Sequence, residues 1–462
     1  MLPRVALVNV GFEPDEPNVN SSPPLGAMCV GAYLRRSSVE VRLFDWSGYA
    51  LEEARRKELE EYDPDIVGFT VLLSSSILRA MEVSRWSKEL GATVVWGGPA
   101  PTCLPEMTLR DAQVDYVVVG EGEETMLELC RSIGSGHSPS EVMGIAFQKD
   151  GEFVATPPRP RIRDLDSLPM PLWDSLGDLG RYLVPFYGRM AMPMNTSRGC
   201  PALCSFCYTK KMWGYRWSSI SAQRIVEEIR IIQSIEPRMN GVIFDDDLFA
   251  GSIDRVREFC EIVTRDGPDL LWNCELRADQ ISEGLLKLMK EAGCRQVLVG
   301  VESGSQRLLD LTLKKTKVED LKRAFEIIRR AGIDGDALIM VGLPGESEDD
   351  FRRTEKLLDG LKAYHYEFKV YMPYPGTELF EVAKAHGFIE PESLSEWAKR
   401  SEVHRSAIAE RNLSSVPWKR VEKLMDKMER RTRSARYWEA FKTDPVTAPA
   451  RAIRLFKRSK SS

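Results

Sequence analysis

Short apolar runs recur between residues 5 and 119, and stretches with helical periodicity separate them. Runs that are apolar at nearly every position, rather than at alternate ones, are typical of parallel strands covered by helices on both faces. The sequence therefore predicts a doubly wound, Rossmann-like α/β domain over residues 1–148. Its predicted strands are 5–10, 39–44, 66–70, 93–96 and 116–119.

A second series of apolar runs begins near residue 190 and alternates with amphipathic helical patterns. Val318, Leu321, Phe325 and Ile328 give one such pattern, with the spacing of a buried helix face. Six strand-helix units predict a partial (β/α)6 barrel over residues 186–380, with ligands at the carboxyl ends of its strands. The predicted strands are 190–195, 241–245, 270–276, 296–301, 336–341 and 366–372.

Two further segments complete the predicted organisation. Residues 149–185 are rich in proline, which predicts the end of a hairpin followed by an interdomain linker. Residues 381–462 are predicted to form a helical, basic C-terminal region. Its stretch 419–441 carries Val421, Leu424, Met428 and Trp438 partly on one side, which favours a solvated helix that closes the barrel.

Charge is distributed unevenly along the chain. The whole chain has a formal net charge of −5, whereas residues 417–462 contain fourteen Lys and Arg against five Asp and Glu. Residues 450–458 are basic and amphipathic, so peripheral contact with an anionic membrane is a hypothesis, and it would suit a lipid substrate. This stretch lacks interleaved stacking aromatics and a recognisable module, so nucleic acid is not an expected partner.

The termini and most of the cysteines suggest where the protein resides. Residues 1–10 resemble a first strand rather than a signal peptide, and no apolar run approaches the 18 residues of a membrane-spanning helix. Six of the nine cysteines lie scattered in surroundings that suit buried free thiols, so we expect a cytoplasmic protein, associated with a membrane only if the basic C-terminus binds one. These six are Cys29, Cys103, Cys130, Cys260, Cys274 and Cys294.

The remaining three cysteines form the most informative motif. They stand in the run Cys200-Pro201-Ala202-Leu203-Cys204-Ser205-Phe206-Cys207, after a predicted strand. Three thiolates on one loop can hold three irons of a cubane cluster and leave the fourth iron open to a small molecule. Zinc is the alternative, but a structural zinc site needs four ligands, and the chain has no CxxC or HxxxH partner elsewhere.

The spacing Cys-x3-Cys-x2-Cys, with an aromatic residue before the last cysteine, resembles the radical S-adenosylmethionine (SAM) enzymes. In that superfamily the open iron of a 4Fe-4S cluster binds SAM, and one-electron reduction cleaves SAM to a 5′-deoxyadenosyl radical. The resemblance implies that Cys200, Cys204 and Cys207 bind the cluster and that Phe206 lies against the adenine. It also implies an electron donor such as flavodoxin or ferredoxin.

Polar residues at three predicted strand ends would complete a SAM site. Asp245 and Asp246 end the second barrel strand, where the family binds the SAM amino group and where carboxylates imply a cationic partner. Arg277 ends the third strand, and its guanidinium could pair with the SAM carboxylate. Glu302 and Ser303 close the fourth, and the resemblance implies that the Glu302 carboxylate reaches the ribose hydroxyls. Ordinary ion pairs are the alternative for each.

Two later loops have the sequences Gly-Leu-Pro-Gly-Glu (342–346) and Pro-Tyr-Pro-Gly-Thr (373–377). They combine rigid and permissive residues that suit backbone close to a ligand, although plain turns have the same composition. Their resemblance to loops of radical SAM proteins favours a cofactor-facing position.

Glycine-containing loops follow three predicted strands of the N-terminal domain, where small residues let a bulky ligand approach the backbone. No GxGxxG follows the first strand, so the dinucleotide fingerprint is missing. Together with Pro-Pro-Leu-Gly at 23–26, these loops ahead of a cysteine-bearing barrel resemble the cobalamin (B12)-binding radical SAM enzymes. That family includes carbon and phosphorus methylases and anaerobic magnesium-protoporphyrin ester cyclases. The loop residues implied in cobalamin binding are Gly68, Thr70, Gly97, Gly98, Gly120 and Glu121.

The chain departs from the family pattern at two points. Ala100 follows Gly-Gly-Pro where many relatives have histidine, and a DxHxxG lower-ligand motif is absent. Cobalamin would therefore bind without an axial histidine from the protein, or the domain would be a vacant relic, as in some aminoglycoside diol dehydratases.

These observations predict an enzyme that uses the cluster, SAM and cobalamin to methylate an unactivated carbon of a small-molecule or lipid substrate. Radical cyclisation, dehydration or rearrangement without methyl transfer is the alternative, and product mass separates the two. A cobalamin or iron-sulfur sensor is a third hypothesis, which predicts SAM binding without formation of 5′-deoxyadenosine. The sequence assigns no side chain a general acid-base role.

Overall fold

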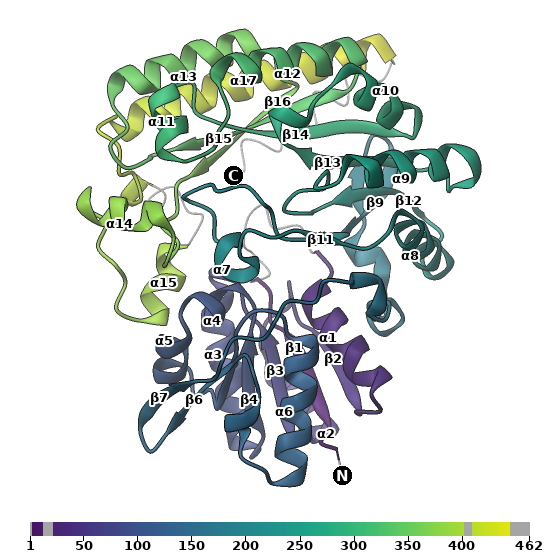
Figure 1. The fold of residues 1–462 in the computed structure, drawn as a ribbon, viewed down its shortest axis with the longest axis vertical. Coiled ribbons are helices and arrows are strands. Elements are labelled where there is room, and N and C mark those ends of the chain that lie inside the picture. Colours follow the sequence, from purple (N-terminus) through teal and green to yellow (C-terminus); the bar gives the residue numbers. More distant parts are fainter. Residues whose placement is uncertain (1, 13–21, 402–408, 444–462) are drawn as a thin grey trace.

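The computed structural model describes residues 2–12, 22–401 and 409–443, with side chains as far as residue 432. These residues form two seven-stranded sheets. Figure 1 shows the N-terminal sheet and its helices in the lower half and the second sheet in the upper half, with the short helix α7 (Thr209–Trp213) between them. The predicted combination of a doubly wound domain and a partial barrel is confirmed.

The N-terminal sheet has the order β2-β1-β3-β4-β5-β6-β7. Its first five strands are parallel, and the hairpin β6–β7 adds two antiparallel strands at one edge. Because β2 and β3 lie on opposite sides of β1, a topological switch point lies between β1 and β3, where open α/β sheets bind ligands. The strands are β1 (Val5–Asn9), β2 (Val41–Asp45), β3 (Ile66–Thr70), β4 (Thr93–Gly97), β5 (Tyr116–Val118), β6 (Ile145–Lys149) and β7 (Glu152–Ala155).

The helices of this domain cover both faces of the sheet (Figure 1). The helices are α1 (Leu25–Arg36), α2 (Glu53–Tyr62), α3 (Ser76–Glu89), α4 (Pro99–Cys103), α5 (Pro105–Asp111) and α6 (Glu123–Ser135). The sheet reaches Ala155, past the domain boundary expected at residue 148, because the β6–β7 hairpin pairs with β5. Between the two sheets the chain forms three short 3-10 helices, η2 (Leu165–Ser167), η3 (Trp173–Ser175) and η4 (Leu179–Tyr182).

The second sheet has the order β16-β15-β14-β13-β12-β9-β8. Six of its strands are parallel, as predicted, and the short β8, which the sequence did not predict, pairs antiparallel with β9. The strands are β8 (Val184–Phe186), β9 (Arg189–Met194), β12 (Met239–Phe244), β13 (Leu271–Leu276), β14 (Cys294–Glu302), β15 (Asp334–Val341) and β16 (His365–Val370). A separate two-stranded ladder joins β10 (Ser197–Arg198) to β11 (Ser218–Ser219).

Amphipathic helices follow the strands of the barrel and bury one face each against it. The helices are α8 (Ala222–Ile235), α9 (Ile253–Asp266), α10 (Glu283–Glu291), α11 (Gln306–Leu311), α12 (Val318–Ala331) and α13 (Glu348–Leu361). Leu321, Phe325 and Ile328 of α12 are buried, so the predicted helical face is confirmed.

An aromatic cluster fixes the end of β12. Phe244 packs edge-on against Trp272 with ring centroids 5.7 Å apart, and Phe259 packs against the same indole at 5.5 Å. Such pairs contribute about 0.5–1.5 kcal/mol each beyond the burial of their area. The cluster therefore holds Phe244 firmly, immediately before the three aspartates that follow the strand.

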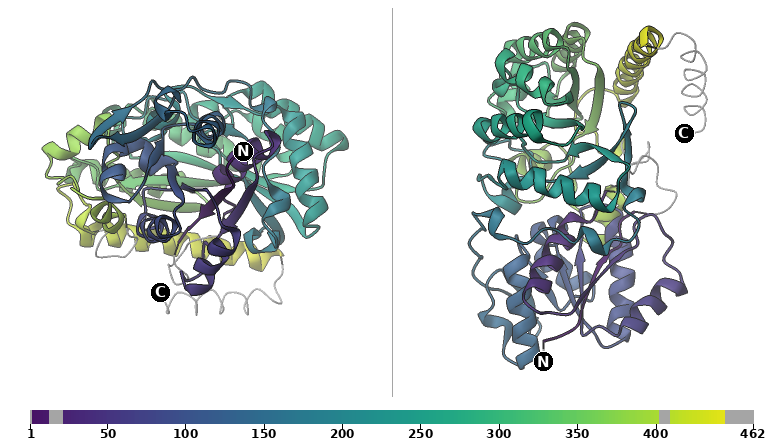
Figure 2. Two further views of the ribbon diagram at one scale, coloured as in Figure 1. Left: turned by 90° about the horizontal axis from the view of Figure 1, so that it is seen from below. Right: turned by 90° about the vertical axis from the view of Figure 1, so that its right-hand side faces the viewer.

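The C-terminal helices connect the two domains. Helices α14 (Glu378–Ala385) and α15 (Leu394–Arg400) bury Phe380 and Trp397 in a core shared with the N-terminal sheet. Figure 2 shows α17 (Trp418–Thr443) along the barrel, where it packs against β16 and buries Val421, Leu424 and Met428. The prediction of a helix that closes the barrel is thus confirmed. The Trp438 side chain and the basic stretch 450–458 lie outside the described residues.

Among the described residues, no helix combines the length and the apolar character that a membrane span requires.

Candidate active site

A cavity of about 450 Å³ lies between the two domains. The carboxyl ends of β3, β4 and β5 form its lower wall, and the ends of β9 and β12 together with α7 form its upper wall. Apolar side chains of the N-terminal domain also line it, among them Leu7 of β1, Val95 of β4 and Met126 of α6. The cavity therefore opens at the switch point of one sheet and faces the strand ends of the other.

The three predicted glycine loops converge on this cavity, and Gly68, Thr70, Gly97, Gly98, Gly120 and Glu121 all line it. Gly98 has φ +95°, and a side chain there would lie 3.1 Å from Thr70 and Val71. Gly120 has φ +85° with open space where a Cβ would be. Both positions therefore need glycine, and at Gly120 the missing side chain leaves room for a ligand to reach the backbone. The glycine loops therefore give the cavity a wall of backbone that a bulky ligand can approach.

Glu121 lines the cavity, but its carboxylate is already engaged. One oxygen accepts a hydrogen bond from Arg198 at 2.8 Å, and the other accepts one from the Ile162 amide at 2.8 Å. Arg198 also pairs with Glu123, and Arg161 lies 4.0 Å from Glu121. Glu121 therefore belongs to an ion network that joins the domains, and its contact with cobalamin stays a prediction.

The sequence did not indicate this network. Arg198 lies two residues before Cys200, whereas Glu121 and Glu123 belong to the N-terminal domain. The side chains of Glu121 and Glu123 are 5% and 4% exposed, and that of Arg198 is 17% exposed. Burial lowers the pKa of Arg198, but the neighbouring acidic groups, Glu123 first among them, together outweigh this effect and raise that pKa above its ordinary value. No local pattern could have linked residues so far apart in the chain.

The three motif cysteines lie on one loop, and their thiols are free and partly exposed. Ser205 anchors the loop, because its amide donates to the Thr312 carbonyl at 2.9 Å and its hydroxyl to the Leu311 carbonyl at 3.0 Å. Burial raises the pKa of the Cys207 thiol to about 11. Burial also raises the pKa of Cys204, while the nearby cations Lys314 and Arg277 oppose the rise. Soft sulfur donors beside cations fit an iron-sulfur cluster, whose thiolate ligands carry negative charge.

The alternative of a zinc site receives no support. Among the side chains that the structure describes, no three His, Cys, Asp or Glu residues gather closely enough to hold a single metal ion. Cysteines that ligate different irons of one cubane stand farther apart than ligands of one ion, so a cluster does not require such a tight group.

The three aspartates after β12 have different surroundings. Asp245 faces the cavity, and burial raises the pKa of its carboxyl to about 6, with Asp246 adding to the rise. Asp247 also lines the cavity and accepts a hydrogen bond from the Gly199 amide at 3.1 Å, directly before Cys200. Asp247 was not among the predicted residues, and it holds the start of the cysteine loop.

Asp246 does not line the cavity, and its predicted place in the SAM site stays a prediction. It is 1% exposed and accepts hydrogen bonds from the Thr196 amide at 2.8 Å, the Thr196 hydroxyl at 2.9 Å and the Ser197 hydroxyl at 2.6 Å. These donors and the nearby Arg255 satisfy the carboxylate, so we assign Asp246 to the anchoring of the segment between β9 and the cysteines.

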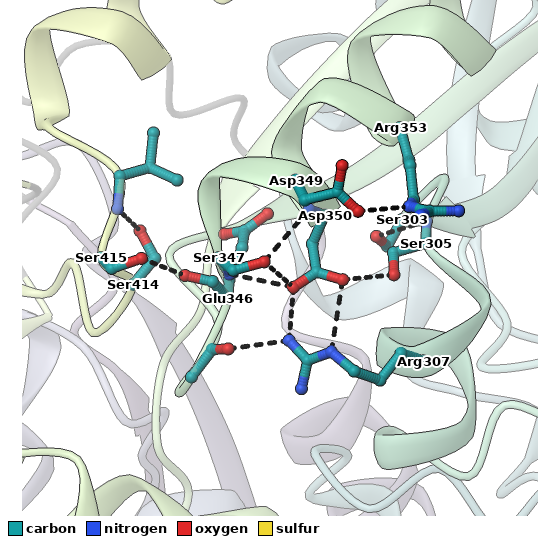
Figure 3. Close-up of polar contacts among 12 residues, drawn as sticks. Ser303, Ser305, Arg307, Glu346, Ser347, Asp349, Asp350, Arg353, Ser414 and Ser415 are labelled. Atoms are coloured by element: carbon teal, nitrogen blue, oxygen red, sulfur yellow. Dashed lines mark hydrogen bonds and ion pairs between the residues drawn. The ribbon is translucent and has the colours of Figure 1, made fainter.

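Ser303 also points away from the cavity. It is 1% exposed, and its hydroxyl lies 3.0 Å from the Thr354 hydroxyl and accepts a hydrogen bond from the Ser305 amide at 3.1 Å. Figure 3 shows Ser303 and Ser305 beside the ion pair of Asp350 with Arg307. These hydrogen bonds serve the packing of α13 on the barrel, and a contact of Ser303 with a cofactor stays a prediction.

Glu302 and Arg277 do lie near the cysteine loop. Glu302 has φ +57° at an irregularity in the β14–β15 ladder, and its carboxylate lies 2.6 Å from the Lys314 ammonium. Arg277 is paired with Asp279 at 3.0 Å and donates to the Lys314 carbonyl at 3.2 Å. Burial raises the pKa of the neighbouring Glu275 to about 7, and Asp245 contributes to the rise. Lys314 and Glu275 are members of this charged group that the sequence did not single out.

Phe206 is half-buried and packs against the core shared by α14, α15 and the N-terminal sheet, so a contact with adenine stays a prediction. In the Gly-Leu-Pro-Gly-Glu loop, the Glu346 carboxylate accepts a hydrogen bond from the Gly342 amide at 3.1 Å. Figure 3 shows that the Glu346 backbone also meets Ser415, whose amide donates to it at 2.9 Å. Glu346 therefore stabilises the conformation of the loop 342–346 to which it belongs.

Known proteins share both halves of this arrangement. Residues 194–358 match the model of the radical SAM superfamily, and residues 19–130 match that of the B12 binding domain. An uncharacterized methyltransferase of Pyrococcus horikoshii is 31% identical over 376 residues, which cover 80% of each chain. An anaerobic magnesium-protoporphyrin IX monomethyl ester cyclase of Rubrivivax gelatinosus is 32% identical over 343 residues, or 71% of this chain and 60% of the cyclase.

The fold has a counterpart among solved structures. The radical SAM methyltransferase TsrM from Kitasatospora setae, with cobalamin and a [4Fe-4S] cluster bound, has a TM-score of 0.68 at 20% identity. The match covers 85% of this chain and 81% of that one.

The two domains and the cysteine loop define a radical SAM enzyme with a B12-binding domain. This chain belongs to the family of cobalamin-dependent radical SAM enzymes, and the predicted class is confirmed. Its cofactors are a 4Fe-4S cluster, SAM and cobalamin, also as predicted. The individual residues that bind these cofactors stay predictions.

Proposed function

We propose that this enzyme methylates an unactivated carbon of a small molecule or lipid that binds in the cavity between the domains. The observation that carries the proposal is that one cavity is lined both by the glycine loops of the B12-binding domain and by the strand ends beside the cysteine loop. Cobalamin supplies a transferable methyl group, and SAM with the cluster supplies the radical chemistry. A substrate in this cavity would lie within reach of both.

Different residues of this chain would bind the different cofactors. Cys200, Cys204 and Cys207 would hold the cluster, and Gly97, Gly98 and Gly120 with Gly68 and Thr70 would let cobalamin lie against the backbone. Asp245 would meet the SAM amino group, Arg277 its carboxylate, Glu302 the ribose, and Phe206 the adenine. A flavodoxin or ferredoxin would supply the electron.

The test begins with anaerobic reconstitution with iron, sulfide and hydroxocobalamin, followed by desalting and measurement of iron and cobalamin per chain. Cys204→Ala is expected to lose iron, whereas Gly120→Leu is expected to lose cobalamin and keep iron. Candidate substrates are then supplied with SAM labelled in its methyl group. Label in a product that has gained one methylene supports methyl transfer, whereas wild-type protein that retains no cobalamin contradicts it.

A second candidate is radical cyclisation without methyl transfer, because one relative at 32% identity is named a cyclase. It predicts 5′-deoxyadenosine and a product that has not gained a methylene. The hypothesis of membrane contact concerns residues outside the described ones. If it is correct, removal of residues 446–462 should reduce sedimentation with anionic vesicles.

A further inference from the structure

Lys314 is a buried lysine at the ends of the barrel strands. Its side chain is 12% exposed, and its ammonium lies 2.6 Å from Oε1 of Glu302, whose side chain is 11% exposed. Lysine is rarely buried without a partner, and the desolvation of a buried ion pair offsets most of its attraction. Stability alone therefore gives little reason for a lysine and a glutamate to occupy this position.

A glycine makes room for the pair. A Cβ built on Gly300 of β14 would lie 2.3 Å from the Lys314 ammonium and 2.6 Å from Oε1 of Glu302. Any side chain at residue 300 would therefore displace both charged groups. Strand β14 thus has a glycine at a position where a larger side chain would fill the space that the ion pair occupies in the barrel.

The turn that carries Lys314 is strained. Leu313 and Lys315 on either side have φ +50° and +55°, and Glu302 itself has φ +57°. Left-handed backbone is unfavourable for such residues and persists where the surroundings enforce it, often at functional sites. Three residues in this conformation around one ion pair indicate that the pair is held in a fixed geometry.

The same turn contacts the other parts of the site. The Thr312 carbonyl accepts a hydrogen bond from the Ser205 amide of the cysteine loop at 2.9 Å. The Lys314 carbonyl accepts one from Arg277 at 3.2 Å. The turn 312–315 thus joins the cysteine loop, the end of β13 and the end of β14.

We propose that Lys314 is a positioning residue for SAM: its ammonium holds the Glu302 carboxylate in the orientation that accepts hydrogen bonds from the ribose hydroxyls. The inference rests on the proposed role of Glu302. Lys314 acts through Glu302, so the pair behaves as one unit.

The test compares Lys314→Met with Lys315→Met, a matched control in the same strained turn whose side chain is exposed. Calorimetry on the reconstituted proteins measures their affinity for SAM and for an analogue without ribose hydroxyls, and iron per chain reports folding of the cysteine loop. Lys314→Met is expected to weaken SAM binding about tenfold and to bind the analogue as the wild type does, because charge-assisted hydrogen bonds to the ribose are lost. Lys315→Met should bind both like the wild type.

The double variant Lys314→Met with Glu302→Gln is expected to bind SAM no more weakly than Glu302→Gln alone. Additive losses would overturn the inference, as would a Lys314→Met protein that binds SAM normally while Glu302→Gln does not. Wild-type affinity in both single variants would instead overturn the proposed role of Glu302. If Lys314→Met loses iron, Lys314→Gln is measured in its place, and preferential loss of SAM over the analogue is again the expected result.

Discussion

Replacement of Arg198 by methionine tests the ion network between the domains. Methionine keeps much of the length and apolar surface of the side chain but removes the guanidinium that pairs with Glu121 and Glu123. The side chains of Glu121 and Glu123, which are 5% and 4% exposed, would then be buried carboxylates without their main cation. The substitution therefore leaves buried charge that the fold can no longer compensate.

The size of the effect follows from burial. Removal of one partner from a buried ion pair costs about 3–5 kcal/mol, whereas an exposed pair is worth at most about 1 kcal/mol. Arg161 lies 4.0 Å from Glu121 and can offset part of the loss at that residue. Arg198→Lys should recover only part of the stability, because an ammonium cannot reproduce the two-sided geometry of a guanidinium.

Urea denaturation followed by tryptophan fluorescence measures the free energy of unfolding. Arg265→Met is the control, because Arg265 forms an exposed pair with Asp266, and its midpoint should match the wild type. Addition of Glu123→Gln to Arg198→Met should restore part of the lost stability by removing one buried charge. If Arg198→Met is as stable as Arg265→Met, the network does not hold the domains together.

Four further substitutions and one control test the site. Gly120→Leu should abolish cobalamin retention. Gly136→Leu should not, because Gly136 has a similar positive φ and open space but lies at the far end of α6. Equal losses of cobalamin in the two variants would contradict the cavity assignment. Glu228→Gln should increase stability at pH 8, because burial raises the pKa of Glu228 from 4.5 to about 7. The raised pKa contributes its full stability to the folded protein below pH 4.5, and this contribution, at most about 3 kcal/mol, is lost as the pH rises through 7. A difference in stability between Glu228→Gln and the wild type that does not vary with pH would therefore refute the assignment. Asp246→Asn should lower the urea midpoint, whereas Asp245→Asn should only weaken SAM binding. If Asp245→Asn lowers the midpoint and Asp246→Asn only weakens SAM binding, the roles assigned to the two aspartates are exchanged.

Local sequence patterns determined the positions of the strands and the chemistry of the cysteine loop. Apolar runs predicted the five parallel strands of the first domain and all six parallel strands of the barrel, because a strand buried on both faces is apolar throughout. The run from Cys200 to Cys207 predicted a cluster because three thiols lie on one short loop. The glycine loops met at one cavity because carboxyl ends of parallel strands lie at the same edge of a sheet.

Only the tertiary structure decided which polar residues face the cavity. Asp245 and Asp246 are neighbours with the same chemistry, but consecutive side chains leave a strand end in opposite directions, and packing determines which direction is solvent. The pairing of Arg198 with Glu121 joins residues 77 positions apart, and that of Lys314 with Glu302 depends on a strained turn beside a glycine. Such contacts have no local signature, because they arise from the approach of separate segments once the two sheets have folded.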